Sequence, residues 1–179
     1  MTLSAPFTLS TQVQIDELDA ALGTLEREVA RQRRMLAEFA EIYSEVGEAS
    51  SLSAMVQGIY TKAESILKNL VEAIDGKVSP GGAWQAELLN AASAQNPGVR
   101  YALISHSTYK AMQDVLGFRH VVRSHYSEEI RVSRAREVAT ETVSTMRSLI
   151  GELRHFLSPI DDENAKDEFT YQDSRPGEK

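Results

Sequence analysis

A hydrophobic seam near the N-terminus constrains the fold of this chain more than any other feature. Apolar residues recur there at alternating spacings of three and four, the pattern of a long helix that buries one face. The seam predicts a helix from about Thr11 to Val46, with Ser10 as its N-cap and Gly47 as its stop. Polar Gln32 interrupts the seam, and we expect a partly exposed position there; a role in fixing helix register is the alternative.

Four further segments have helical periodicity, and they predict helices over Leu52–Asp75, over Ala83–Gln95, from about Ser105 or Ser107 onward, and over Val132–Leu157. Aromatic residues make up only 7% of the chain, and abundant Ala, Leu and Glu favour helices over sheets. A chain of 179 residues is long enough for one well-buried core. We therefore expect an all-α bundle of about five helices over residues 1–157, with a long N-terminal helix.

The net charge of −7 is unevenly distributed along the chain. Residues 158–179 carry seven acids and three bases, a net charge of −4, without apolar periodicity, which predicts a disordered acidic tail. Between Arg119 and Arg136 five arginines face only two acids, a basic spot that suits a phosphate, an acidic partner or a neighbouring acidic helix. The chain has no cysteine, no secretory signal and no apolar run of about 20 residues, so we expect a cytoplasmic protein without a membrane span.

Basic and aromatic side chains cluster at the end of the fourth predicted helix: Arg119, His120, Arg123, His125 and Tyr126. At about 100° per residue, the two arginines and the tyrosine share one narrow stripe, which the histidines border. A metal-free ribonuclease needs a base near neutrality and donors that stabilise charge on the phosphorane, and histidine and arginine supply them. The alternative is structural, with the arginines paired to acids of neighbouring helices. No histidines and acids have the spacing of a metal site.

Two residues of the second predicted helix are candidates to meet this cluster. Tyr60 and Glu64 are four residues apart and therefore lie on one helix face. We expect that face to meet the Arg119 stripe, with Glu64 as a buried ion-pair partner. Trp84, beside a glycine-rich turn, is expected to anchor the core.

The cluster resembles a known motif. The segment from Phe118-Arg119-His120 to His125-Tyr126 is similar to the signature of HEPN domains, an arginine, a polar residue and a histidine a few positions later. The block FRHVVR…Y especially resembles HepT-like toxins. The resemblance covers about Tyr60 to Ile130 and includes three further blocks, Ile59–Lys68, Pro80–Trp84 and Glu87–Leu89.

The resemblance implies a HEPN-like helical bundle that forms a homodimer, with two signature helices lining one cleft. It also implies metal-independent RNA cleavage, and neutralisation by an MntA-like nucleotidyltransferase antitoxin that adenylylates the motif tyrosine. Residue by residue, Arg119 is the motif arginine, His120 the polar residue after it and Tyr126 the tyrosine. Better-known members have histidine five positions after the arginine, whereas this chain has Ser124 there and His125 one place later.

Three hypotheses follow. The first is an endoribonuclease toxin of a bacterial toxin–antitoxin pair, without a cofactor. In it Arg119, His120 and His125 are catalytic, Arg119 and Arg123 bind RNA, and Tyr126 is the modification site. The second, prompted by the displaced histidine, is a non-catalytic helical binding module that partners a nucleotidyltransferase. The third is a coiled-coil adaptor, which the first helix suggests but which has no use for the Arg/His cluster.

Overall fold

The computed structural model of the protein describes residues 3–39, 45–76, 84–124 and 131–158, without the side chains of 45–46 and 121–124. These ranges contain five helices: α1 (Ala5–Glu38), α2 (Glu45–Asp75), α3 (Trp84–Ser93), α4 (His106–Ser124) and α5 (Val132–Leu157). No β-strand occurs in the described ranges, and the predicted all-α fold is confirmed.

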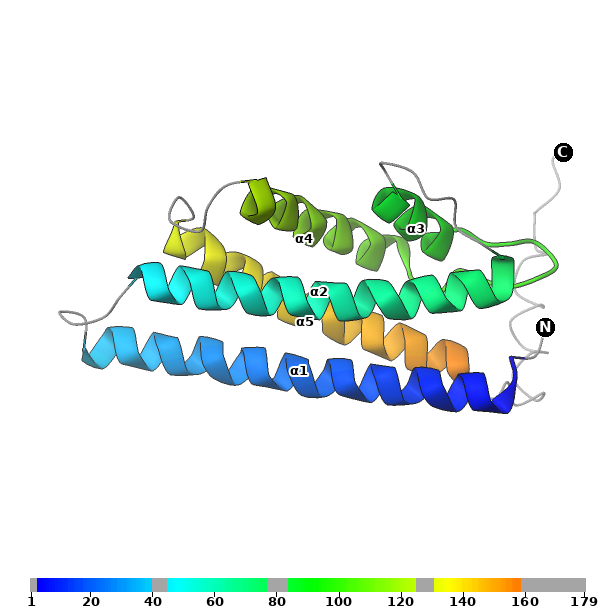
Figure 1. The fold of residues 1–179 in the computed structure, drawn as a ribbon, viewed down its shortest axis with the longest axis horizontal. Helices are drawn as coiled ribbons and strands as arrows, with labels where there is room; N and C mark the ends of the chain where they lie inside the picture. Colours follow the sequence, from blue (N-terminus) through cyan, green and yellow to red (C-terminus); the bar gives the residue numbers. More distant parts are fainter. Residues whose placement is uncertain (1–2, 40–44, 77–83, 125–130, 159–179) are drawn as a thin grey trace, which may run out of the picture.

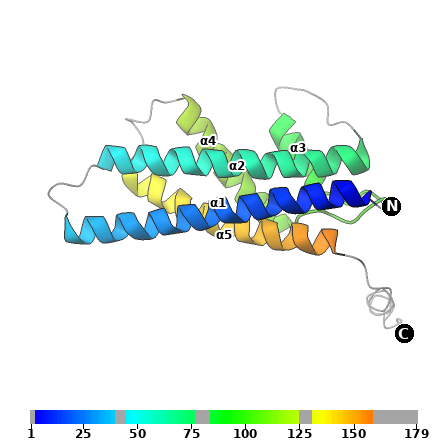
Figure 2. The ribbon, with the colours of Figure 1, turned by 60° about the horizontal axis from the view of Figure 1, so that its bottom comes forward.

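The long helices α1, α2 and α5 lie side by side and contact one another along the bundle (Figures 1 and 2). Helices α3 and α4 pack on the side of α2 that faces away from α1, and α4 also contacts α5. The C-terminal end of α4 lies at the end of the molecule where α2 and α5 begin (Figure 1). The Arg/His motif therefore lies at one end of the bundle.

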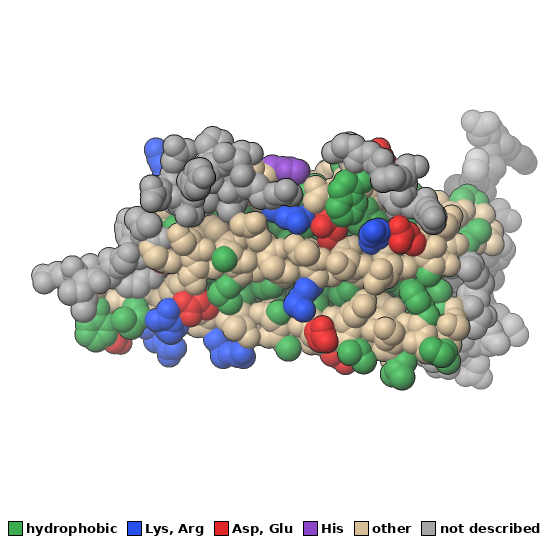
Figure 3. All heavy atoms as spheres, in the orientation of Figure 1, with side chains coloured by type: hydrophobic (Ala, Val, Ile, Leu, Met, Phe, Trp, Pro, Cys, Tyr) green, Lys and Arg blue, Asp and Glu red, His purple; other side chains and the backbone are tan. Residues whose placement is uncertain are grey.

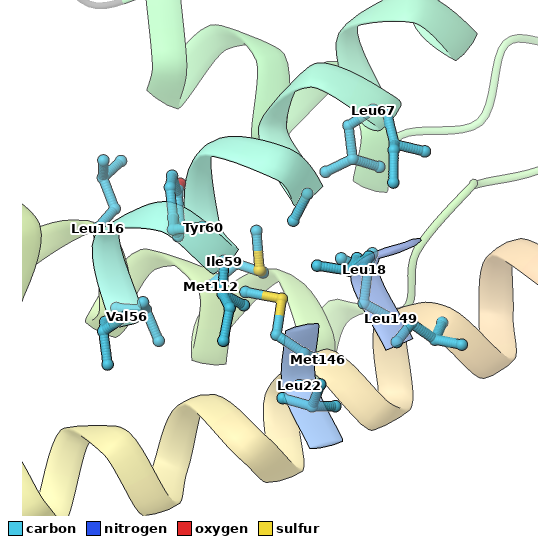
Figure 4. Packing of buried hydrophobic residues seen from close by; sticks show 14 of the residues in the cluster. Leu18, Leu22, Val56, Ile59, Tyr60, Leu67, Met112, Leu116, Met146 and Leu149 are labelled. Atoms are coloured by element: carbon cyan, nitrogen blue, oxygen red, sulfur yellow. The ribbon is translucent and has the colours of Figure 1, made fainter. Parts of the chain in front are cut away.

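The core follows the apolar stripes of the sequence. Close up, Met112 of α4 and Met146 of α5 lie beside Ile59 of α2, and Leu18 and Leu22 of α1 approach from the other side (Figure 4). All five side chains are buried, and each contributes roughly 1.5–3 kcal/mol through the hydrophobic effect. Trp84 packs against the same core, as predicted.

The predicted start of the first helix is wrong. Helix α1 begins at Ala5, with Ser4 in the N-cap position, so Ser10 lies inside the helix. Pro6 stands in the first turn, where its missing N–H would have no intrahelical partner. The helix therefore begins six residues, nearly two turns, before the predicted start at Thr11.

The predicted continuous helix to Val46 is also wrong. Helix α1 ends at Glu38, and α2 begins at Glu45 and already includes Gly47. Residues 39–44 contain neither glycine nor proline, and the apolar spacing happens to continue in phase across them. The chain nevertheless reverses, because α2 must pack back along α1 to bury the seam. Tertiary burial thus overrides the local pattern.

The other helix boundaries agree better with the sequence. Helix α5 has the predicted bounds, and α2 ends at Asp75, as predicted, before Gly76 with φ 91°. Helix α3 begins one residue later and ends two residues earlier than predicted. The predicted acidic tail lies, except for Ser158, outside the described residues.

Gln32 does not have the expected partial exposure. Its side chain is buried, with 3% of the residue's surface exposed, because both α2 and α5 pack against this part of α1. Nearby polar groups are buried as well: Glu48 of α2, 4% exposed, forms an ion pair with Arg136 of α5. The interior between α1, α2 and α5 is therefore partly polar at the end where α1 ends and α2 and α5 begin.

At the opposite end of α2, a buried arginine side chain links the helix terminus to the end of α3. The Arg100 side chain, 3% exposed, pairs with the Asp75 carboxylate at the end of α2. Its guanidinium also donates to the carbonyls of Ala91 at 2.8 Å, Ala94 at 2.9 Å and Tyr101 at 3.0 Å. These bonds fix the segment after α3 and satisfy carbonyls at the end of α3.

Candidate functional site at the end of α4

The first turn of α4 is anchored to α5. Ser105, the residue before the helix, accepts a hydrogen bond from the backbone N–H of Thr108 at 3.2 Å, as an N-cap does. Glu152 of α5 accepts from the backbone N–H of Ser105 at 3.1 Å and from the Thr108 hydroxyl at 2.9 Å. The predicted capping by Ser105 is thus confirmed, and these bonds set the direction in which α4 crosses the bundle.

The buried face of α4 then turns Arg119 toward α2. Met112, Val115, Leu116 and Phe118 are all buried, at most 7% exposed. Arg119 follows Met112 by seven residues and Leu116 by three, so its side chain leaves the helix beside this apolar face. The motif arginine therefore projects onto α2 and not directly into solvent.

Arg119 forms an ion pair with Glu64 of α2. Its Nη1 donates to both carboxylate oxygens, at 3.1 and 3.3 Å, and its Nη2 donates to the Thr61 hydroxyl at 3.2 Å. The two charged side chains are 12% and 9% exposed. The predicted buried partnership of Glu64 with the arginine is confirmed. On the face seen in Figure 3, basic and acidic side chains gather beside a histidine where α4 passes over α2.

An aromatic ring lies beneath the guanidinium. The Cζ atom of Arg119 is 5.3 Å from the centroid of the Tyr60 ring, within range of a cation–π contact. Burial raises the pKa of the Tyr60 phenol, and the nearby Glu64 carboxylate raises it further, so this tyrosine stays neutral. Tyr60 thus acts as a platform that limits where the guanidinium lies.

The guanidinium is held but its donors are not all used. Among the residues that the structure describes, the Nε–H of Arg119 has no acceptor. A partly exposed, positioned guanidinium with an unused donor is suited to bind a phosphate or to stabilise negative charge on one.

Comparison with known proteins identifies the family. The sequence model of the family described as "HepT-like protein" matches residues 51–160, which include α2 from Ser51 onward and the whole of α3, α4 and α5. The chain belongs to the HepT-like family. Searches of curated proteins and of solved structures gave no match. Membership of the HepT-like family suggests a HEPN-type toxin–antitoxin module.

The structure describes only part of the HepT-like motif. Arg119 and His120 lie in α4, and the His120 side chain is exposed. Arg123 also lies in α4, but its side chain is outside the described part of the chain. His125 and Tyr126 lie outside the described residues altogether. The described geometry therefore brings Arg119 together with Tyr60 and Glu64, and it does not bear on the histidine–tyrosine half of the motif.

Sequence reasoning missed one contact of the HepT-like site. Thr61 lies three residues before Glu64, hence on the same face of α2, and that spacing was a usable signal. Within the described ranges, no three His, Asp or Glu side chains form a group that could hold a metal ion. Nor is any described helix both long enough and apolar enough to cross a membrane.

Proposed function

We propose that this HepT-like chain is a metal-independent endoribonuclease, the toxin of a bacterial toxin–antitoxin pair acting in the cytoplasm. The observation that carries the proposal is the state of Arg119, which Glu64, Thr61 and Tyr60 hold in place while its Nε–H and the second N–H of Nη2 have no acceptor among the described residues. A guanidinium that the fold holds in place, with donors not bonded to the fold, can bind a phosphate without losing a structural contact.

The proposed reaction divides the work between arginine and histidine. A histidine, His125 or His120, takes the proton from a ribose 2′-hydroxyl, and the 2′-oxygen attacks the adjacent phosphorus. Arg119 stabilises the charge that builds on the phosphorane oxygens, and Arg123 binds a phosphate of the RNA. The bond from phosphorus to the 5′-oxygen then breaks, leaving a cyclic phosphate, and the departing 5′-oxygen takes up a proton and becomes a hydroxyl.

Cleavage of a labelled RNA by purified protein tests this assignment. Arg119→Ala is expected to lower the cleavage rate about 10²–10³-fold, since a donor of this kind typically supplies ~2.7–4 kcal/mol. EDTA is expected to have no effect. Arg147→Ala is the matched control, because Arg147 is an exposed arginine of α5 that pairs with Glu26 of α1 and lies outside the basic spot. Full cleavage by a folded Arg119→Ala protein, or loss of cleavage in EDTA, would contradict the proposal.

We place the proposed homodimer interface on the outward face of α2. The stretch 49–61 contains no charged residue, and Figure 3 shows little charge along this part of the helix. Gly58 lies exposed in mid-helix, where glycine is less stable than alanine, and a Cβ there would meet nothing within 4 Å. Close approach of a second copy gives this glycine a role, and the face adjoins Thr61 of the Arg119 site.

Light scattering tests this interface. Gly58→Leu is expected to shift the wild-type dimer mass to that of a monomer and to lower cleavage with it. Gly151→Leu is the matched control, since Gly151 is also exposed in a helix with open space around it. A monomeric wild-type chain at micromolar concentration would remove the shared cleft from the proposal.

The proposed partner is an MntA-like nucleotidyltransferase antitoxin that modifies Tyr126. A nucleotide on this tyrosine would add a phosphate that competes for Arg119 or Arg123 and occupies the space of the RNA phosphate. Co-expression with the neighbouring nucleotidyltransferase, followed by intact mass, tests this; the added mass should vanish in Tyr126→Phe. An unmodified wild-type chain that is still neutralised would mean that the antitoxin inhibits by binding alone.

One sequence observation favours a second candidate function. Ser124 stands where better-known family members have histidine, and a chain without a working base would be a non-catalytic binding module. Substituting His120 and His125 separately distinguishes the two. A folded wild-type dimer that binds RNA but leaves it intact would support the binding module.

A further inference from the structure

Three buried oxygen atoms of the long bundle lack partners. Gln32 Oε1, Ser53 Oγ and Thr142 Oγ1 accept or donate no hydrogen bond among the described residues. The three residues are 3%, 2% and 0% exposed, and they come from α1, α2 and α5. Every long helix of the bundle therefore contributes one unsatisfied polar group to the interior.

The contacts between α1 and α5 place two of these groups at one level. Arg33 of α1 donates to the Thr140 hydroxyl of α5 at 3.5 Å. The helices run in opposite directions, so stepping back one residue along α1 moves one residue forward along α5 (Figure 1). Gln32 therefore lies within a residue of the level of Thr142.

The third group lies at the same level of α2. Helices α2 and α5 run in the same direction, and the ion pair of Glu48 with Arg136 aligns them (Figure 1). Five residues further along each helix, Ser53 of α2 reaches the level just before Thr142 of α5. We call Gln32, Ser53 and Thr142 the polar layer.

The two hydroxyls of the polar layer do not use the usual local acceptor. Six other helical threonines donate to the backbone carbonyl four residues earlier: Thr8, Thr11, Thr24, Thr61, Thr140 and Thr145. Ser53 and Thr142 make no such bond. Their hydroxyls are thus left for a group that their own helices do not supply.

We propose that the polar layer binds internal water, hydrogen-bonded to Gln32 Oε1 and to the hydroxyls of Ser53 and Thr142. Water is the ligand that matches this chemistry, because it donates to the amide oxygen and both donates to and accepts from hydroxyls. Buried waters typically make about three hydrogen bonds to groups that would otherwise be unsatisfied. The three groups of the polar layer are neutral, and the carboxylates nearest to them are already paired, Glu28 with Arg31 and Glu48 with Arg136, which leaves no counter-charge for an ion.

The water has a structural role at one end of α1. Gln32 is the last fully buried residue of that helix, so the polar layer lies close to its end at Glu38. The C-terminal third of α1 is therefore held to α2 and α5 partly through solvent. This inference is independent of the proposed ribonuclease activity.

Oxygen-17 magnetic relaxation dispersion on the full-length protein counts long-lived internal waters and tests the inference. Thr142→Val keeps the side-chain shape and removes the hydroxyl, so at least one long-lived water should be lost. Thr145→Val is the matched control, because the Thr145 hydroxyl is buried on the same helix but already bonded to the Glu141 carbonyl. It should leave the count unchanged.

A crystal structure of the wild type gives a second, independent readout. It should contain ordered water within hydrogen-bond distance of Ser53 Oγ, Thr142 Oγ1 and Gln32 Oε1. Equal water counts in wild type and Thr142→Val, or an equal loss in Thr145→Val, would overturn the inference. So would direct bonds from the three oxygens to protein groups.

Discussion

Arg100 and Arg119 both pair with carboxylates of α2, and they differ in how their remaining donors are used. Arg100 at one end of α2 bonds Asp75 and three backbone carbonyls, and its side chain is 3% exposed. Arg119 bonds Glu64 and Thr61 and is 12% exposed, with an Nε–H that has no acceptor within the described ranges.

The difference separates two roles of the same chemical group. A guanidinium with every donor bonded to the fold cannot bind a ligand without breaking the structure, and Arg100 therefore acts as a structural staple. A guanidinium that is held in place but has unused donors can bind a phosphate with little rearrangement. This favours the rate of a reaction at that phosphate as well as its binding. The predictions below aim to break or sharpen this distinction.

The largest effect is expected from Arg100→Ala, measured as the free energy of unfolding in urea. Arg100→Ala removes the partner of Asp75 and the donor to three backbone carbonyls, and losing a hydrogen bond that involves a charged group typically costs roughly 1.5–3 kcal/mol. RNA cleavage per folded molecule should not change. Arg134→Ala, which breaks an exposed pair, should cost about 0–1 kcal/mol. Similar losses for the two variants would remove the staple role from Arg100.

Glu64→Gln should affect the site more than the fold. The amide keeps the shape of the carboxylate but no longer anchors Arg119 by charge, and small displacements of a catalytic group can cost up to about 10²-fold in rate. We expect cleavage to fall roughly 10–10²-fold while RNA binding persists. Glu72→Gln, which alters a peripheral pair with Lys68, is the control. Unchanged cleavage in Glu64→Gln would mean that Arg119 does not need this anchor.

Much of the fold could be predicted from the sequence because most helices have a single uninterrupted apolar stripe. Helix α5 is the clearest case, with the predicted bounds at both ends. The turn between α1 and α2 could not be predicted, because residues 39–44 contain no helix breaker and the spacing continues in phase. Gln32 was misjudged because periodicity marks a face as apolar but does not tell how many helices cover it.

The site was predictable where it depended on helix geometry. The spacing of Tyr60 and Glu64 places them on one helix face, and the hypothesis that this face meets Arg119 is confirmed, although the spacing alone does not tell which helix the face contacts. The Arg100 staple was not predictable, because its acceptors are Asp75 and carbonyls brought together only by the folded chain. No spacing rule links a loop arginine to such partners.

A smaller effect should come from the aromatic platform under Arg119. A cation–π contact at a partly exposed site contributes ~0.5–2 kcal/mol. A double-mutant cycle of Tyr60→Leu and Arg119→Ala, measured by urea unfolding, should give a coupling energy in that range. Tyr60→Phe keeps the ring and should keep the coupling. A coupling near zero would mean that the ring fills the core without holding the guanidinium.

The smallest effect is a pH dependence that distinguishes the Arg100 staple from ordinary surface pairs. Burial alone would raise the pKa of Asp75, but hydrogen bonds from Arg100 and Asn96 outweigh it and hold the pKa below its ordinary value of 3.8. A carboxyl with a lowered pKa in the folded state stabilises the protein fully above that ordinary value. The contribution is lost as the pH falls below that value, because the unfolded state then binds a proton that the folded state does not, and this proton stabilises the unfolded state.

Asp75→Asn removes this carboxyl, and urea unfolding from pH 6 to pH 3 tests its contribution. The wild type should be more stable than the variant at pH 6, and this difference in stability should narrow toward pH 3.

Glu28 is the matched comparison, since its pKa is also lowered, by its hydrogen bond to Arg31 on the surface of α1. Glu28→Gln should show the same sign with a smaller gap, because its partner Arg31 is 56% exposed and largely screened by solvent, whereas the Arg100 side chain is 3% exposed. A gap for Asp75→Asn that stayed constant with pH would mean that the neutral amide lacks some other contact. The charge of Asp75 would then not be what Arg100 holds.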